Sequence, residues 1–174
     1  MTNDYFTSAA GTRSVLTKEQ FDRAFALLSD LAAKLRVSAV FLTDGTGRIL
    51  AAKKSSGFSV DATVFSALTA ASASATNEMA RLLGEAEPFQ MVLHEGRRRN
   101  AFVCSVGLDC FLIVVFDSGT ALGMIRLLTK RAVEALTPVL TQPPAEEFDL
   151  QQAIGGDFGS LLGDELDRTF KERH

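Results

Sequence analysis

The chain has 174 residues and a mass of 18.7 kDa, which is room for one domain and a tail. Hydrophobic residues make up 47% of it, which excludes a wholly disordered chain, and a net charge of −3 argues against a general nucleic-acid binder. The longest apolar run, Cys110 to Phe116, is far shorter than the ~20 residues of a membrane-spanning helix. The N-terminus also lacks the pattern of a signal peptide. We therefore expect a cytoplasmic protein without membrane insertion.

The first helix is predicted over residues 18–36. Residues 1–16 show no periodicity and are interpreted as a flexible leader. Thr17 and Gln20 then have the spacing of a capping box, in which each side chain accepts a hydrogen bond from the other residue's backbone N–H. Helical spacing of the large apolar residues that follow predicts that they face the core: Phe21, Phe25, Leu28, Leu31 and Leu35.

A β-hairpin is predicted next. Residues 37–43 are β-branched and apolar, which predicts a strand, and residues 48–53 are predicted to form a second strand. Between them, Asp44-Gly45-Thr46-Gly47 has the composition of a tight turn. This explanation is preferred to a phosphate-binding loop.

The second helix is predicted from a cap at Ser59 or Asp61 to about Leu83, with Gly84 directly after it. One face carries the larger side chains and is expected to face the core: Phe65, Leu68, Ser72, Ala75, Met79 and Leu83. The opposite face is small and nearly uncharged, with Ser66, Ala67, Ala70, Ala73, Ser74 and Asn77. An ordinary solvent-facing surface would be rich in Lys and Glu, so this small face is expected to point outward and contact another protein closely.

Three strands and a third helix complete the predicted domain. The strands are expected at residues 89–94, 101–106 and 110–116, and the last, being continuously apolar, should be central. Asp117 or Ser118 should cap a helix at about 120–137 whose inward residues are Leu122, Ile125, Leu128, Ala132 and Leu136. Because tight turns join consecutive strands, the fold is predicted to be an α/β (α+β) sandwich with a five-stranded, largely antiparallel sheet over residues 17–137.

The rest of the chain is predicted to be a linker and a tail. Pro138, Pro143 and Pro144 are expected to end the third helix and to begin a Pro-rich linker over residues 138–147. Residues 148–174 are expected to form a partly helical tail, which is acidic because residues 146–174 carry 8 acidic and only 3 basic side chains. We expect this tail to be separable from the domain.

No catalytic, cofactor or metal site emerges from the motifs. There is no phosphate-binding loop of the G-x-x-x-x-G-K-[ST] type, and Asp157-Phe158-Gly159 matches a kinase tripeptide only by chance. His94 and His174 lack neighbouring ligands, so no metal site is predicted. Cys104 and Cys110 are interpreted as small buried residues. We expect no small-molecule substrate.

Arg97, Arg98 and Arg99 form a dense basic turn with three interpretations. Three guanidinium groups can bind an anion or an acidic partner. They can also be an ordinary solvated turn that deters edge pairing, or a dock for the acidic tail.

The order of the elements and several short stretches resemble the Roadblock/dynein-light-chain domain family. The stretches are Phe41–Asp44 with its glycine turn, Leu68–Ala71, His94–Gly96, Phe116–Asp117 and Leu122–Arg126. Within the family, the resemblance is closest to MglB-type regulators of bacterial small Ras-like GTPases. It covers about residues 17–137.

The resemblance implies an arrangement and a partner. The second helix should cover one face of the sheet, and the first and third helices the other. Homodimers should form through the second helix and the third strand, which here is Phe89, Gln90, Met91, Val92, Leu93 and His94. A small Ras-like GTPase should bind the paired second helices, here through Ser66, Ala67, Ala70, Ala73, Ser74, Asn77 and Arg81. The alternative for the small face is burial in the homodimer seam.

The function expected from the resemblance is non-catalytic regulation of a GTPase, as an activator or effector that contributes no catalytic side chain. A pure scaffold, bridging proteins without an effect on hydrolysis, is the first alternative. An enzyme of an unrecognised class is the second. The likeness to MglB-type proteins also suggests cell polarity or motility.

Overall fold

The structure is a computed structural model that describes residues 16–107 and 109–141, and its elements follow the expected order. In chain order they are α1 (Lys18–Leu35), β1 (Ala39–Asp44), β2 (Ile49–Lys54), α2 (Ala62–Leu82), β3 (Met91–His94), β4 (Arg99–Val106), β5 (Cys110–Asp117) and α3 (Leu122–Thr141). The predictions for residues 1–15 and 142–174, which include His174 and Asp157-Phe158-Gly159, lie outside the described residues.

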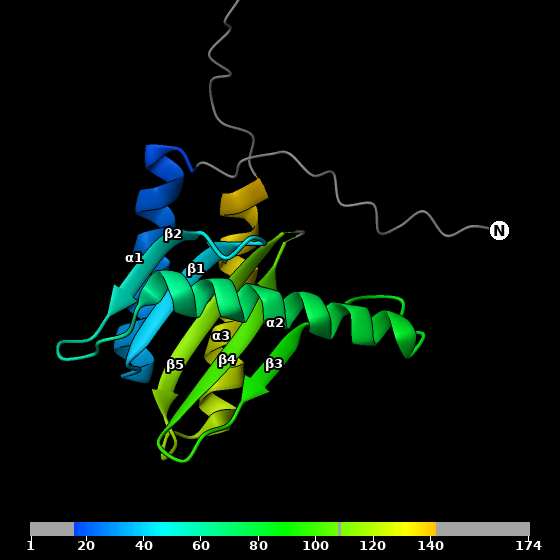
Figure 1. The fold of residues 1–174 in the computed structure, drawn as a ribbon. Helices are drawn as coiled ribbons and strands as arrows, with labels where there is room; N and C mark the ends of the chain where they lie inside the picture. Colours follow the sequence, from blue (N-terminus) through cyan, green and yellow to red (C-terminus); the bar gives the residue numbers. More distant parts are fainter. Residues whose placement is uncertain (1–15, 108, 142–174) are drawn as a thin grey trace, which may run out of the picture. The chain divides into compact units, whose positions relative to one another are not determined.

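The five strands form one antiparallel sheet in the order β2-β1-β5-β4-β3 (Figure 1). β5 lies at the centre and is buried along its whole length up to Asp117, as its continuous apolar sequence predicts. β2 and β3 are the two edge strands. The predicted fold class is therefore confirmed.

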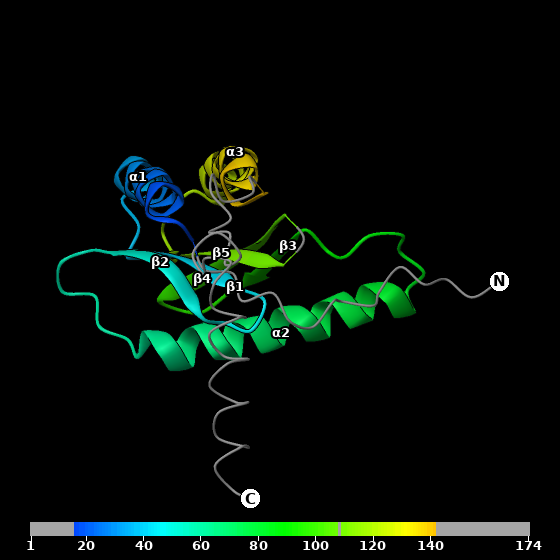
Figure 2. The same ribbon diagram turned by 90° about the horizontal axis from the view of Figure 1, so that it is seen from above.

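Helices cover both faces of the sheet. α1 and α3 lie side by side over one face, and α2 runs across the strands on the other (Figure 2). A core cluster that includes Leu28, Leu112 and Leu136 fills the first layer. A smaller cluster that includes Phe41, Ala70 and Ile113 fills the layer under α2. This is the arrangement that the family resemblance implies.

The helix ends follow the sequence signals. The Thr17 side chain accepts from the backbone N–H of Gln20 at 3.2 Å, and the Gln20 side chain accepts from the N–H of Thr17 at 2.9 Å, which completes the capping box. Asp61 caps α2 by accepting from the N–H of Val64 at 3.1 Å. Gly84 follows α2 with a φ of 78°, a conformation that favours glycine.

α3 is longer than predicted, because Pro138 does not end it. The helix continues to Thr141, so the predicted boundary between domain and linker at residue 138 is wrong. A proline this close to the end of a helix removes only one backbone hydrogen bond. The last turn is held by burial of Val139 and by the Gln20 side chain, whose Nε2 donates to the Val139 carbonyl at 3.0 Å.

The side chains of Phe21 and Phe25 lie at the rim of α1, although both were expected in the core. They are 41% and 37% exposed, whereas Ala24 is completely buried. The buried side of α1 consists of Ala24, Leu28, Leu31 and Leu35, which leaves the two phenylalanines at its edge. Their rings stack on each other at 5.9 Å, and the Lys53 ammonium lies 5.8 Å from the Phe25 ring.

The turn between β1 and β2 is organised by the Asp44 carboxylate. It accepts hydrogen bonds from the N–H and hydroxyl of Thr46 at 3.0 and 2.6 Å, and from the N–H and Nε of Arg48 at 2.9 and 3.0 Å. Burial by itself would raise the pKa of Asp44, but these hydrogen bonds outweigh it and hold the pKa below its ordinary value. The turn is thus a hairpin connection, as predicted.

Replacing Asp44 with alanine is expected to lower the free energy of unfolding by about 2 kcal/mol at pH 7, since four hydrogen bonds lose their acceptor. The pKa of Asp44 is lowered in the folded state, so its carboxylate contributes to the free energy of unfolding above the unfolded-state pKa of about 4. This contribution is lost as the pH falls from there through the lower pKa of the folded state. Urea unfolding of wild type and variant at pH 7 and at lower pH measures this. The difference between their free energies of unfolding should shrink as the pH falls. A difference that is independent of pH contradicts a stabilising role for the ionised Asp44 carboxylate.

Candidate protein-interaction surface

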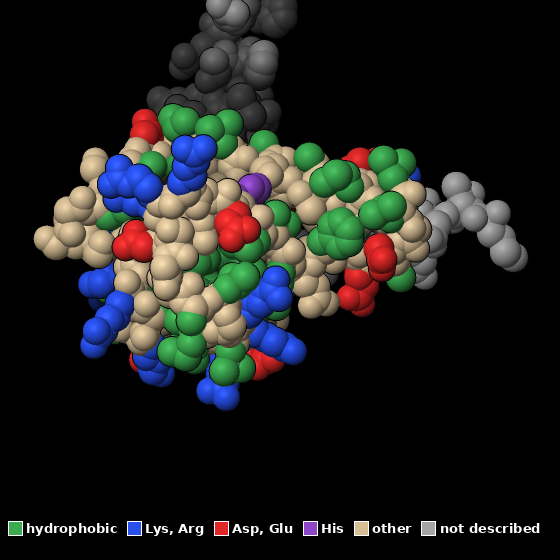
Figure 3. All heavy atoms as spheres, turned by 90° about the horizontal axis from the view of Figure 1, so that it is seen from below, with side chains coloured by type: hydrophobic (Ala, Val, Ile, Leu, Met, Phe, Trp, Pro, Cys, Tyr) green, Lys and Arg blue, Asp and Glu red, His purple; other side chains and the backbone are tan. Residues whose placement is uncertain are grey.

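α2 carries a row of exposed apolar side chains that nothing in the described domain covers. Val64, Leu68, Met79, Leu82 and Leu83, hereafter the apolar face of α2, are between 51% and 74% exposed. The C-terminal part of α2 extends beyond β3, and Figure 3 shows hydrophobic side chains gathered on this projecting part of the molecule. Monomeric proteins rarely leave such a contiguous apolar surface in water, so the face has the character of an interface.

The side of α2 that faces the sheet differs from the one expected, although Phe65 packs against the core as predicted. Ser66, Ala70 and Ala73 were predicted to point outward, but they are 0%, 3% and 6% exposed and pack beneath the strands. Of the other predicted partner-binding residues, Ala67, Ser74 and Arg81 are exposed and Asn77 is half-buried. The Arg81 side chain forms a salt bridge with Glu78.

α2 approaches the β1–β2 turn closely at its N-terminal part. Gly47 has a φ of 86°, and a Cβ at this position would lie 2.6 Å from Cα of Ala67 and 2.8 Å from the carbonyl oxygen of Ser66. Only small side chains fit between backbones at this distance.

The hydroxyl groups on the buried side of α2 find partners within the helix itself. Ser66, Thr69 and Thr76 donate to the carbonyls of Thr63, Phe65 and Ser72 at 3.1, 2.8 and 2.8 Å. Because a buried polar group is costly only when it lacks a hydrogen bond, these side chains can pack against the sheet. Helical periodicity alone does not reveal this local pairing, which is why the buried side of α2 was predicted wrongly.

β3 presents an open edge beside the projecting end of α2. The strand is shorter than predicted: Phe89 and Gln90 precede it, and it spans Met91–His94. It pairs with β4 on one side only among the described residues. An unpaired edge offers its N–H and C=O groups to another strand, so β3 fits pairing with a second chain.

Arg97–Arg99 lie in and after the turn between β3 and β4, and all three side chains are exposed. Ser118 stabilises the turn, because its N–H and hydroxyl donate hydrogen bonds to the carbonyls of Arg98 and Arg97 at 3.0 and 3.1 Å. The Arg99 guanidinium lies 5.0 Å from the centre of the Phe58 ring. The roles considered for this turn, as an anion site or a dock for the tail, stay predictions.

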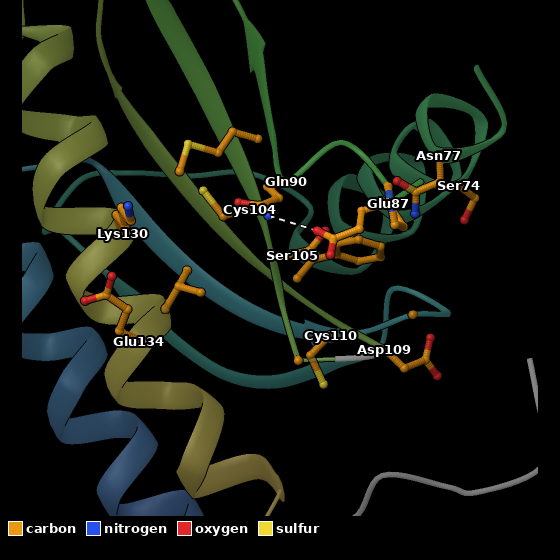
Figure 4. Close-up of a pocket in the computed structure, with 16 residues that line it drawn as sticks. Ser74, Asn77, Glu87, Gln90, Cys104, Ser105, Asp109, Cys110, Lys130 and Glu134 are labelled. Carbon is orange, nitrogen blue, oxygen red and sulfur yellow. Dashed lines mark hydrogen bonds between the residues drawn. The ribbon is translucent and has the colours of Figure 1, made fainter. Parts of the chain in front are cut away.

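Two surface cavities lie near these features. The larger, of about 600 Å³, borders the start of β3 and is lined from α2 by Ser74 and Asn77 and from α3 by Lys130 and Glu134 (Figure 4). The smaller, of about 320 Å³, lies on the α2 side of the sheet. Its lining includes Phe58, Phe65, His94, Arg99 and Asn100.

The two cysteines are small buried residues of the sheet, as predicted. Cys104 and Cys110 are free thiols. Burial raises the pKa of Cys104 to about 12, and burial together with Asp109 and Asp44 raises the pKa of Cys110 to about 11. Both therefore stay protonated at neutral pH.

His94 is exposed at the end of β3, and the described residues contain no group of His, Cys, Asp and Glu that could hold a metal ion.

The described helices include none long and apolar enough to cross a membrane.

The comparisons with known proteins agree with this architecture. The sequence model of the Roadblock/LC7 domain matches residues 25–116, so the chain belongs to the Roadblock/LC7 domain family. Within that family it is similar to the gliding protein MglB of Thermus thermophilus, with 33% identity over 72% of this chain and 94% of that one and a TM-score of 0.68.

Two further solved structures extend the comparison. MglB of Myxococcus xanthus is 30% identical over 74% of this chain and 98% of its own, with a TM-score of 0.68. A Roadblock/LC7 domain from Streptomyces avermitilis shares the fold at 18% identity, with a TM-score of 0.61, over 68% of this chain and 98% of that one. No curated protein sequence matches the chain.

Proposed function

We propose that this chain is a homodimeric, non-catalytic regulator of a small Ras-like GTPase, acting in the cytoplasm. The observation that carries the proposal is the apolar face of α2, which is exposed on a domain whose fold and sequence are similar to MglB. The Thermus relative is a gliding protein, which supports a role in motility or cell polarity.

The proposed dimer forms through β3 and α2. Antiparallel pairing of two β3 edges would give a continuous ten-stranded sheet and leave no open edge at its centre. Because α2 extends beyond β3, its projecting end would then lie under the sheet of the second copy (Figure 1). In this arrangement the smaller cavity, whose lining includes the rings of Phe58 and Phe65, would receive Leu82 and Leu83 of that copy.

The GTPase is proposed to bind the surface that the two α2 helices form together. Among the predicted set, the exposed Ala67 lies beside Val64 and Leu68, and the exposed Ser74 and Arg81 with the half-buried Asn77 follow further along the helix. Small residues next to larger apolar ones let a partner approach while it buries apolar area. The chain would act by holding one switch conformation of the GTPase, whose own groups perform the hydrolysis.

Single-turnover GTP hydrolysis by a purified small Ras-like GTPase from the same genome tests the proposal. Added dimer is expected to raise the rate by ~10³ if it realigns a catalytic arginine of the GTPase. Binding without a change in rate supports the alternative of a scaffold. Absence of binding to both the GTP-bound and the GDP-bound form contradicts regulation of that GTPase.

A further inference from the structure

One end of the domain carries a basic and apolar patch that lies apart from the proposed GTPase surface. The patch consists of Arg36 at the end of α1, Arg97 and Arg98 in the β3–β4 turn, and Met124, Arg126 and Leu127 at the start of α3. Figure 3 looks onto this end of the molecule and shows Lys and Arg side chains around it.

Hydrogen bonds between the elements bring the patch together. Ser118 holds the carbonyls of Arg97 and Arg98 at 3.1 and 3.0 Å, and it precedes the first residue of α3 by only a few positions. Gln20 at the start of α1 donates to Val139 near the end of α3, so the two helices run antiparallel. The end of α1 with Arg36 therefore lies beside the start of α3 (Figure 1).

No salt bridge within the described residues neutralises the positive charge of the patch. None of its four arginines forms a salt bridge with another described residue. Glu95 and Asp117 are the acidic residues of the adjoining segments, and the first turn of α3 contains none. Clustered, uncompensated guanidinium groups produce a positive potential that attracts an anionic surface.

The patch is apolar as well as basic. Met124 and Leu127 are 52% and 50% exposed, and they lie one turn apart on α3, close to Arg126 in the sequence. Neither of the two cavities is lined by a residue of the patch. A peptide needs a groove, whereas protruding apolar side chains among basic ones are the pattern of proteins that bind at the surface of a membrane.

We propose that this patch binds peripherally to a membrane that contains anionic lipids. The arginines would lie at the headgroups, and Met124 and Leu127 would enter the boundary of the acyl chains. The proposal does not depend on GTPase regulation, so each can fail without the other.

Sedimentation of the full-length chain with lipid vesicles tests the proposal. Vesicles of about 70% phosphatidylcholine and 30% phosphatidylserine, in about 20 mM NaCl, should bind the chain, and vesicles of phosphatidylcholine alone should not. About 200 mM NaCl should weaken the binding, because salt screens charges at a surface. Absence of binding to the anionic vesicles at low salt overturns the proposal.

Charge reversal identifies the surface that binds. Each basic residue near an anionic membrane strengthens binding about fivefold, so Arg97→Glu with Arg98→Glu should weaken it at least ~25-fold. The control, Lys18→Glu with Arg23→Glu, changes the net charge equally but lies in the first half of α1, away from the patch, and should have little effect. Equal losses in the two double variants would show attraction by net charge alone and overturn the proposal.

One further double variant and a soluble polyanion complete the test. Met124→Ser with Leu127→Ser should reduce binding about tenfold or more, since buried apolar groups add to the affinity, while the dependence on salt is retained. Circular dichroism and sedimentation should show the same fold and oligomeric state for every variant. If Arg97→Glu with Arg98→Glu weakens binding to soluble polyglutamate but not to vesicles, the partner is an acidic protein and the membrane proposal is wrong.

Discussion

Arginine at Leu68 or at Leu82 is expected to abolish self-association or GTPase binding while the domain stays folded. The two side chains are 66% and 74% exposed, so the substitutions should change the free energy of unfolding by only about 0.5 kcal/mol. In an interface, each would bury a charge without a partner, which costs about 3 kcal/mol or more and weakens binding by at least ~100-fold.

Analytical ultracentrifugation and GTPase binding, measured on the same samples, separate the two roles of α2. A monomeric variant places the residue in the homodimer seam, and a dimer that no longer binds the GTPase places it on the partner surface. Leu127→Arg is the matched control, because Leu127 is 50% exposed on the other side of the sheet and should leave both properties unchanged. If both α2 variants behave like the control, the apolar face of α2 is not an interface.

Arginine at Ala70 should affect folding, unlike arginine at Leu68 or Leu82. Its side chain is 3% exposed and packs under the sheet, so Ala70→Arg is expected to unfold the domain and not merely to remove a binding surface.

Alanine at Gly47 is expected to lower the free energy of unfolding by about 3 kcal/mol or more. The φ of 86° is strained for any residue with a Cβ, and the added carbon would meet the backbone of Ala67 at 2.6 Å. Backbone atoms of a packed helix cannot move aside as a flexible side chain can. α2 would therefore have to shift away from the β1–β2 turn.

Gly57→Ala is the control for this prediction, because Gly57 has a similar φ of 82° but no atom within 4 Å of the place that a Cβ would occupy. It should cost only the backbone strain, about 1 kcal/mol. Chemical unfolding of both variants measures the difference, which is the contribution of close packing. Equal losses would mean that the contact between Gly47 and α2 does not constrain the fold.

Local signals in the chain account for most of the fold. The capping residues Thr17 and Asp61, the glycine after α2 and the continuous apolar run of β5 each correspond to the element that the structure contains. These features act over a few residues, so they can be identified without knowledge of the neighbours in space. Pro138 is an exception, because distant contacts of Val139 and Gln20 keep the last turn of α3 helical.

The candidate site was only partly predictable. The sequence by itself determined that α2 has two distinct faces, one small and one large, since that follows from helical periodicity. Which residues pack under the sheet was decided only by the tertiary structure, in which Ser66, Ala70 and Ala73 are buried and Gly47 lies close to the backbone of Ser66 and Ala67. The larger residues Leu68 and Leu82 stay exposed, because smaller side chains occupy the side of α2 that faces the sheet.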